Sequence, residues 1–437
     1  MPIERVPGKD VTYYLIAFDE DGRERTDDPD GLMSQQIVAA LKEKSVTDIF
    51  LFSHGWKGDI PTAREQYNRW IGTIVSCTAD WDRAASVRPG FKPLFIGLHW
   101  PSLPWGDEEF GSPGVSFAPT EAPDLELLVE SYAQRIACTD KAREALRTIF
   151  TAALQDVAPA TLPQEVRTAY DILNRESGME SKGEGAAPGQ DREPFAPEMA
   201  YQNSQQQVSF GGIDLGGILA PLRQLSFWKM KDRARQFGES GGAGFLSSLQ
   251  TATESNTLRI HLMGHSFGCI VVSAMLAGPA GQGKMVRAVN SLVLVQGALS
   301  IWSYCASLPF EKGKCGYFNT IVSDRRVKGP IVTTQSCHDT AVGSYYPIAA
   351  GLAGQVSFVP GELPKYGALG AFGGRGEGLA IKDITMVPSD SLYRFEPGAL
   401  YNIESSVFIS KMEGASGAHS DIAHAEVAHV IWEAALS

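Results

Sequence analysis

Short apolar runs alternate along the chain with segments whose apolar residues recur at helical spacing. Strands are predicted where the runs are rich in β-branched and aromatic residues, at residues 11–18, 48–53, 93–101, 258–263, 291–295, 330–334 and 401–409. Helical spacing occupies residues 33–41, 124–156, 228–250, 267–277 and 427–434. Continuous apolar strands alternating with helices are typical of a mostly parallel central sheet flanked by helices, so we predict an α/β fold.

The pattern changes between residues 106 and 222. Residues 178–206 are polar and rich in Gly, Pro, Glu and Gln, which predicts a mobile loop, and residues 209–228 turn apolar again. We therefore predict a core of residues 1–105 and 223–437 and a large inserted region, 106–222, that resembles a cap or lid. The stretch 209–228 is either a lid that supplies an acyl pocket or an ordinary packed helix pair.

Composition limits the partners and the location. The 437 residues carry a net charge of −12, which disfavours nucleic acid as a partner because phosphate backbones would be repelled. No apolar run reaches about 18 residues, so no integral membrane segment is expected, and an N-terminus without an apolar leader predicts a cytoplasmic protein. The oligomeric state is left open.

The cysteines predict neither a zinc site nor a disulfide framework. None of the six is paired at the CxxC spacing, and several lie in or beside apolar stretches. We expect reduced, packed thiols, with a bridge between Cys305 and Cys315 as the alternative.

The strongest chemical motif is Gly264-His265-Ser266-Phe267-Gly268. It follows a predicted strand and opens an apolar helix, which is the context that a nucleophile elbow requires. Small residues at positions 264 and 268 allow a strained turn to pack closely, so that Ser266 projects above the sheet. A serine hydroxyl also needs a base, an acid that orients the base, and donors for the oxyanion.

This combination resembles the α/β-hydrolase fold, in the broad lipase and esterase group, over roughly residues 11–105 and 225–437. In that family a His-Gly pair after a strand begins the loop whose backbone N–H completes the oxyanion hole, and His54-Gly55-Trp56 matches it. The resemblance implies that the oxyanion donors are the amides of Trp56 and Phe267. The fuller H-G-G-G form is lacking, and an ordinary strand-end turn is the alternative.

Further residues of these motifs are predicted to lie at the substrate. His54 is expected to be a structural partner rather than the base, and with Gly55 and His265 it should border the substrate site. Trp100 ends another strand at the same edge and is expected either to shape the pocket wall or to pack in the core.

The acid and base are predicted from the order Ser, acid, His along the chain. Asp339 follows the strand 330–334 and matches the family position, while Asp324 precedes that strand and Glu404 lies inside a strand pattern. A second nucleophile pair, Cys337-His338, is disfavoured because Cys337 is not on an elbow.

The base is expected between the last strand and the last helix. His419 lies there, whereas His424 and His429 fall in the terminal helical stretch. Spacing of five residues turns these three histidines away from one another on a helix, so no metal site is predicted.

Together these residues predict a cofactor-free serine hydrolase. Ser266, His419 and Asp339 would cleave a carboxylic ester with a hydrophobic acyl group through an acyl-enzyme. An amidase, thioesterase or acyltransferase could use the same residues, and a binding module with a vestigial triad is the non-enzymatic alternative.

Overall fold

The central feature of the fold is one twisted sheet. The computed structural model describes residues 3–26, 31–43, 45–56, 59–102, 125–207, 217–252, 258–349 and 363–437. Within these ranges the strands are β1 (Ile3–Arg5), β2 (Thr12–Ala17), β3 (Asp48–Ser53), β4 (Pro93–His99), β5 (Arg259–His265), β6 (Ser291–Val295), β7 (Ile331–Gln335), β8 (Ile381–Thr385) and β9 (Leu400–Glu404).

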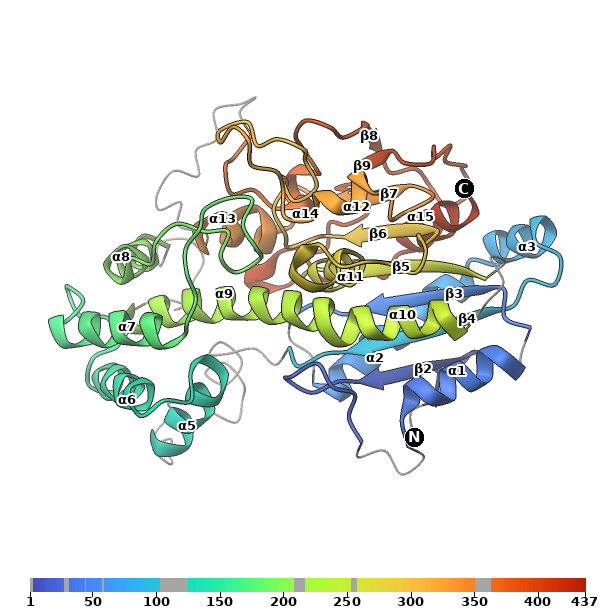
Figure 1. Ribbon diagram of the computed structural model, residues 1–437. Helices are drawn as coiled ribbons and strands as arrows, with labels where there is room; N and C mark the ends of the chain where they lie inside the picture. Colours follow the sequence, from blue (N-terminus) through green and yellow to red (C-terminus); the bar gives the residue numbers. More distant parts are fainter. Residues whose placement is uncertain are drawn as a thin grey trace.

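The strand order is β1-β2-β4-β3-β5-β6-β7-β9-β8 (Figure 1). The pair β1–β2 is antiparallel and the other neighbouring pairs are parallel. The predicted α/β fold with a mostly parallel sheet is confirmed. After β3 the chain forms β4 on one side of β3 and then β5 on the other side, so the order of the strands reverses at β3. Sheets with such a reversal of strand order bind ligands beyond the carboxyl ends of the two strands that flank it, which here are β3 and β5.

Alternate residues of each strand enter two different hydrophobic cores. On β3, Ile49 and Leu51 belong to one core and Phe50 and Phe52 to the other. This period of two, together with burial on both faces, explains why the strands read as continuous apolar runs.

Helices cover both faces of the sheet. The first core is covered by α1 (Met33–Glu43), α9 (Ala220–Phe237), α10 (Ala243–Ala252) and α11 (Gly268–Ala277), of which α9, α10 and α11 lie in front of the sheet in Figure 1. The second core is covered by α2 (Ile60–Ser76), α3 (Thr78–Val87) and α15 (Ala425–Leu436).

A group of helices lies beyond the carboxyl ends of the strands, toward which the arrowheads point in Figure 1. It comprises α5 (Leu125–Ile136), α6 (Asp140–Gln155), α7 (Gln164–Glu176) and α8 (Pro197–Gln207). The buried residues of these helices share one hydrophobic core with α9. The predicted boundary between insertion and core, at residues 222/223, falls inside α9. The division into core and insertion stays a prediction.

The expected mobile loop at residues 178–206 is wrong. α8 occupies its second half. In the first half, Arg192 is buried with its guanidinium carbon 3.7 Å from the centroid of the Trp228 ring, and it donates to the carbonyls of Met179 and Gly189. Its polar composition therefore supplies buried hydrogen bonds rather than solvation. Residues 209–216 of the apolar stretch 209–228 lie outside the described residues.

Other elements refine the predicted boundaries. The stretch 124–156 is two helices, because Thr139 caps α6 by accepting from the amide of Ala142. The stretch 228–250 is interrupted by the π-helix η2 (Gly238–Gly242). The remaining helical pieces are η1 (Gly217–Leu219), η3 (Pro279–Gly281), α12 (Asn319–Ser323), η4 (Ala341–Tyr345), α13 (Tyr346–Ala349), α14 (Leu369–Phe372) and η5 (Gly414–Ser416).

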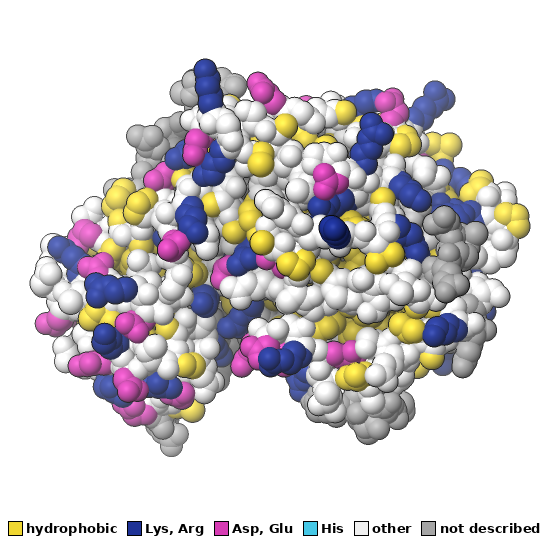
Figure 2. Space-filling view, in the orientation of Figure 1, with side chains coloured by type: hydrophobic (Ala, Val, Ile, Leu, Met, Phe, Trp, Pro, Cys, Tyr) yellow, Lys and Arg dark blue, Asp and Glu magenta, His cyan; other side chains and the backbone are white. Residues whose placement is uncertain are grey.

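Three further properties of the described structure concern its surface charge, its cysteines and the length of its apolar helices. In Figure 2 basic and acidic side chains are interspersed at the lower left, over α5–α7, rather than collected into one basic patch. All six cysteines are free thiols, so the alternative bridge between Cys305 and Cys315 is not formed. Across the described ranges, no helix combines the length and the apolar character needed to span a membrane.

Candidate active site

Ser266 sits on a strained turn between β5 and α11. Its φ is 56°, a left-handed conformation that costs a non-glycine residue on the order of 1 kcal/mol or more. The turn is held by the Ser266 amide, which donates to the Val295 carbonyl, and by the Ser266 carbonyl, which accepts from the amide of Ala298. The predicted strand-to-helix context of the motif is confirmed.

The glycines of the motif are required by close backbone contacts. A Cβ at Gly264 would lie 2.4 Å from the Gly268 carbonyl oxygen, and one at Gly268 would lie 2.2 Å from the Ser53 carbonyl oxygen. Any larger residue would therefore push the turn off the ends of β3 and β5.

A hydrogen-bonded chain joins the predicted nucleophile, base and acid. The Oγ of Ser266 lies 2.8 Å from Nε2 of His419, and Nδ1 of His419 lies 2.7 Å from Oδ2 of Asp339. A carboxylate only accepts, so Nδ1 carries the proton and Nε2 is left to accept from the hydroxyl. Asp339 is buried, whereas the His419 side chain is 12% exposed.

Two loops bring the acid and the base together. Asp339 and Gly417 form an isolated antiparallel bridge between the loop after β7 and the loop before α15. The amide of Ala418 donates to the carbonyl of His338 at 2.9 Å. The carboxylate of Asp339 is also fixed at its second oxygen, because Oδ1 accepts from the amide of Val342 at 3.1 Å.

The amides predicted as oxyanion donors flank the same turn. β3 pairs directly with β5, and a Cβ at Gly55 would lie 2.7 Å from the Cβ of Ser266. Among the described residues, no group accepts a hydrogen bond from the backbone amide of Trp56 or of Phe267. As far as the described residues go, both amides are therefore available to donate to an oxygen bound near Ser266.

His54 supports the loop that carries Trp56. Its Nδ1 lies 2.8 Å from the Gly55 carbonyl oxygen, which can only accept, so Nδ1 carries the proton. Burial lowers the pKa of His54 to about 4, so the ring is neutral at neutral pH. The N–H that follows in a planar trans peptide points opposite to its carbonyl. The bond therefore turns the Trp56 amide away from the His54 ring.

Trp100 and His99, at the end of β4, hold His54 in place. The Trp100 ring is buried, stacks on His54 with centroids 5.7 Å apart, and donates Nε1–H to the His54 carbonyl. Nδ1 of His99 lies 3.2 Å from Nε2 of His54. Of the two roles expected for Trp100, the structure shows core packing.

His265 is bound to protein groups through both ring nitrogens. Nε2 donates to the His419 carbonyl at 2.9 Å, and Nδ1 accepts from Nε2 of Gln66 at 3.1 Å. Burial and the neighbouring His419 lower the pKa of His265 to about 3. The ring thus holds the backbone of the predicted base, and a substrate contact for His54, Gly55 or His265 stays a prediction.

An aromatic cluster borders the open amides. The Trp56 and Phe267 rings stack with centroids 5.6 Å apart, and Phe227 of α9 contacts both rings, at 6.2 and 5.2 Å. Tyr346 extends the cluster beyond Phe227. Trp56 and Phe227 are half-buried, so apolar surface reaches the edge of the site.

The competing candidates lie away from this chain of hydrogen bonds. Asp324 pairs with Arg326 at 2.8 Å, and Glu404 accepts from the amide of Ser406. The thiol of Cys337 is exposed. His424 pairs with Asp421.

His429 belongs to a separate buried ion cluster with Asp80 and Glu433, whose ligand-type atoms lie within 4.8 Å of one another. Arg83 already forms ion pairs with both carboxylates, and the ring nitrogens of His429 bond to Asp80 and to the Ser391 carbonyl. A metal ion would have to displace the guanidinium, so the residues fit an ion-pair network better than a metal site.

One residue of the site was missed from the sequence. Gln296, the first residue after β6, donates from Nε2 to Oδ2 of Asp339 at 2.8 Å. A polar residue directly after a buried strand, at the edge where the other motifs end, was the one sequence signal that pointed to it.

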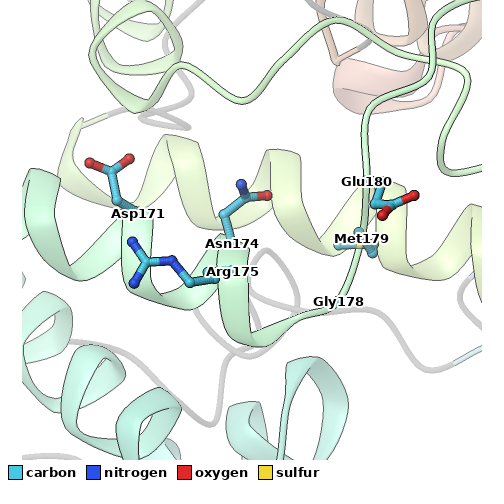
Figure 3. A pocket seen from close by; sticks show the side chains of 6 residues that line it. All are labelled: Asp171, Asn174, Arg175, Gly178, Met179 and Glu180. Atoms are coloured by element: carbon cyan, nitrogen blue, oxygen red, sulfur yellow. The ribbon is translucent and has the colours of Figure 1, made fainter.

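A surface hollow lies elsewhere, on α7 and the segment after it (Figure 3). Its lining residues are Asp171, Asn174, Arg175, Gly178, Met179 and Glu180, and none of them belongs to the site around Ser266.

Comparison of the chain with protein-family models, curated proteins and solved structures yields no match. A function must therefore be inferred from the geometry of the site.

Proposed function

We propose that this chain is a serine hydrolase of the α/β-hydrolase type that cleaves carboxylic esters. The observation that carries the proposal is the continuous hydrogen-bonded chain Ser266–His419–Asp339 on a strained strand-to-helix turn. A turn of this kind raises the hydroxyl above the sheet edge, and the bond from His419 to Asp339 fixes the tautomer that can accept its proton.

In the proposed mechanism Ser266 Oγ attacks the ester carbonyl while Nε2 of His419 takes its proton. The negative charge that develops on the carbonyl oxygen is stabilised by the amides of Trp56 and Phe267. The imidazolium returns the proton to the leaving alkoxide, and an acyl-enzyme remains. Water then attacks the acyl-enzyme while His419 takes its proton, and the imidazolium returns that proton to Ser266 Oγ as the acid is released. These steps need no cofactor.

The aromatic cluster supports a hydrophobic acyl group. Trp56 and Phe227 present partly exposed ring surface beside the amides of Trp56 and Phe267, and apolar acyl chains bind favourably where they cover such surface. Amides and thioesters could be attacked by the same residues, so both are tested as substrates alongside esters.

The test is hydrolysis of short p-nitrophenyl esters by the wild type, by Ser266→Ala and by Ser248→Ala. Ser248 is an exposed serine of α10 whose hydroxyl bonds to the Gly244 carbonyl. We expect Ser266→Ala to lose activity by several orders of magnitude and Ser248→Ala to match the wild type. Full activity of Ser266→Ala would refute the proposal. Matched amide and thioester substrates then decide which acyl derivative is cleaved fastest.

A further inference from the structure

Gln296 is fixed in one orientation beside the acid of the site. Its side chain is fully buried, and Nε2 donates to Asp339 Oδ2 at 2.8 Å, the same oxygen that accepts from Nδ1 of His419. The Thr334 hydroxyl accepts from the backbone N–H of Gln296 at 3.0 Å and donates to the side-chain Oε1 of Gln296, also at 3.0 Å. Because Oε1 is taken by a donor, the NH₂ group is the part that faces Asp339.

The backbone at this position is held in an unfavourable conformation. Gln296 has a φ of 46°, which for a non-glycine residue costs on the order of 1 kcal/mol or more. Gly370 packs directly against it, since a Cβ there would lie 2.7 Å from the Gln296 carbonyl carbon, and the Gly370 amide donates to the Gly297 carbonyl. The strain is maintained from both sides, by β7 and by α14.

We infer that Gln296 is a positioning residue for the proposed hydrolysis and acts through Asp339. With Val342 on Oδ1 and Gln296 on Oδ2, the carboxylate cannot rotate away from His419. This inference rests on the proposed function, because a positioning residue has an effect only if His419 is the base.

Two substitutions separate positioning from simple filling of space. Gln296→Met keeps the length of the side chain but cannot donate. Gln296→Glu keeps its shape, donates while its carboxyl is protonated, and adds a negative charge when it ionises. The matched control is Gln335→Met, because Gln335 is half-buried at the end of the neighbouring strand β7 and no hydrogen bond between described residues joins it to Asp339.

The expected readouts are kinetic. Gln296→Met should lower kcat by about 10- to 100-fold with little change in KM, as happens in comparable sites when a group that orients a functional side chain is lost. Gln296→Glu should keep kcat close to that of the wild type at neutral pH, because a buried carboxyl beside the Asp339 carboxylate stays protonated and donates as the amide does. Gln335→Met should behave as the wild type.

Other titratable groups near the pair leave this kinetic comparison interpretable. The ring of His265 lies 4.9 Å from that of His419, but its pKa of about 3 keeps it neutral at neutral pH. Asp421, in the same loop as His419, is paired with His424, and His338 precedes Asp339 in the other loop. All of these are retained in every variant, so a difference in kcat reports on position 296.

The outcomes are distinct. If Ser266→Ala is inactive and Gln296→Met keeps the wild-type kcat, the inference is overturned while the proposed function stands. If Ser266→Ala is fully active, the proposed function itself fails. Should Gln296→Met not fold, Gln296→Leu replaces it, and an unchanged kcat in Gln296→Leu overturns the inference.

Discussion

Asp339 and Gly417 pair as an antiparallel bridge, and this pairing joins the loop of the proposed acid to the loop of the proposed base. The carbonyl of His338 accepts from the amide of Ala418, one residue before His419. Gly417 has a φ of 64°, and a Cβ there would lie 2.3 Å from the His338 carbonyl oxygen. Small residues at this contact therefore determine whether acid and base can meet.

Gly417→Ala should separate the two loops. Gly414→Ala is the matched control, because Gly414 has a φ of 55° in the same loop but a Cβ added there would meet nothing within 4 Å. We expect the control to lose about 1 kcal/mol of unfolding free energy from backbone strain alone, with activity intact. Gly417→Ala should lose more and should lower kcat at least about tenfold. Urea unfolding and ester hydrolysis measure both, and equal behaviour of the two variants would argue against a coupling of the loops.

Asp339→Asn should lower kcat by about three to four orders of magnitude, because an amide can donate to Nδ1 and so favour the wrong tautomer of His419. Asp324→Asn tests the competing aspartate. Its carboxylate is half exposed and pairs with Arg326, so this variant should keep nearly full activity. The assignment of the acid is reversed if the two variants exchange these results in steady-state kinetics.

Local patterns predicted much of this arrangement, and pairings between distant segments account for the rest. Because β3, β5, β6 and β7 are buried on both faces, they are continuous apolar runs that a sequence pattern predicts. The elbow motif could be predicted because its residues are consecutive in the chain. The role of Gln296 depends on β6 lying beside β7, which no local pattern reveals. The edge strand β8 alternates between half-buried and exposed residues and has too few apolar residues to form a recognisable pattern.

Phe227→Ala should change the preference for the acyl group. Removing this ring takes apolar surface from beside Trp56 and Phe267. We expect kcat/KM for an octanoyl ester to fall about tenfold relative to that for an acetyl ester. Phe310→Ala is the control, since Phe310 is an exposed ring that packs on Trp302. An unchanged ratio in Phe227→Ala would show that the acyl chain binds elsewhere.

Acid should destabilise the protein through its buried histidines. Burial lowers the pKa of His54 to about 4 and those of His99 and His265 to about 3, against about 6.5 when unfolded. Below pH 6.5 the unfolded chain binds protons that the folded chain does not. The unfolding free energy should therefore fall between pH 6.5 and 4, by up to about 1.4 kcal/mol per pH unit for each histidine.

His265→Gln should flatten that slope, because Gln can still donate to the His419 carbonyl but does not titrate. His429→Gln is the control of opposite sign. Burial lowers the pKa of His429, but bonds to Asp80 and to the Ser391 carbonyl outweigh it and raise the pKa overall. Its contribution is fully present below pH 6.5 and is lost only as the pH rises through the raised value, so the acid slope should be unchanged. Urea titrations at several pH values measure the slopes, and no difference between the variants would contradict the neutral, buried state of His265.

The central claim is that Ser266 is a nucleophile activated by His419. Its most direct test is the reaction of the folded wild type with a fluorophosphonate, followed by mass spectrometry of the digested protein. We predict one phosphonyl adduct on the peptide that contains Ser266, and much slower labelling of His419→Gln. An unlabelled wild-type protein, or an adduct on another residue, would contradict the claim.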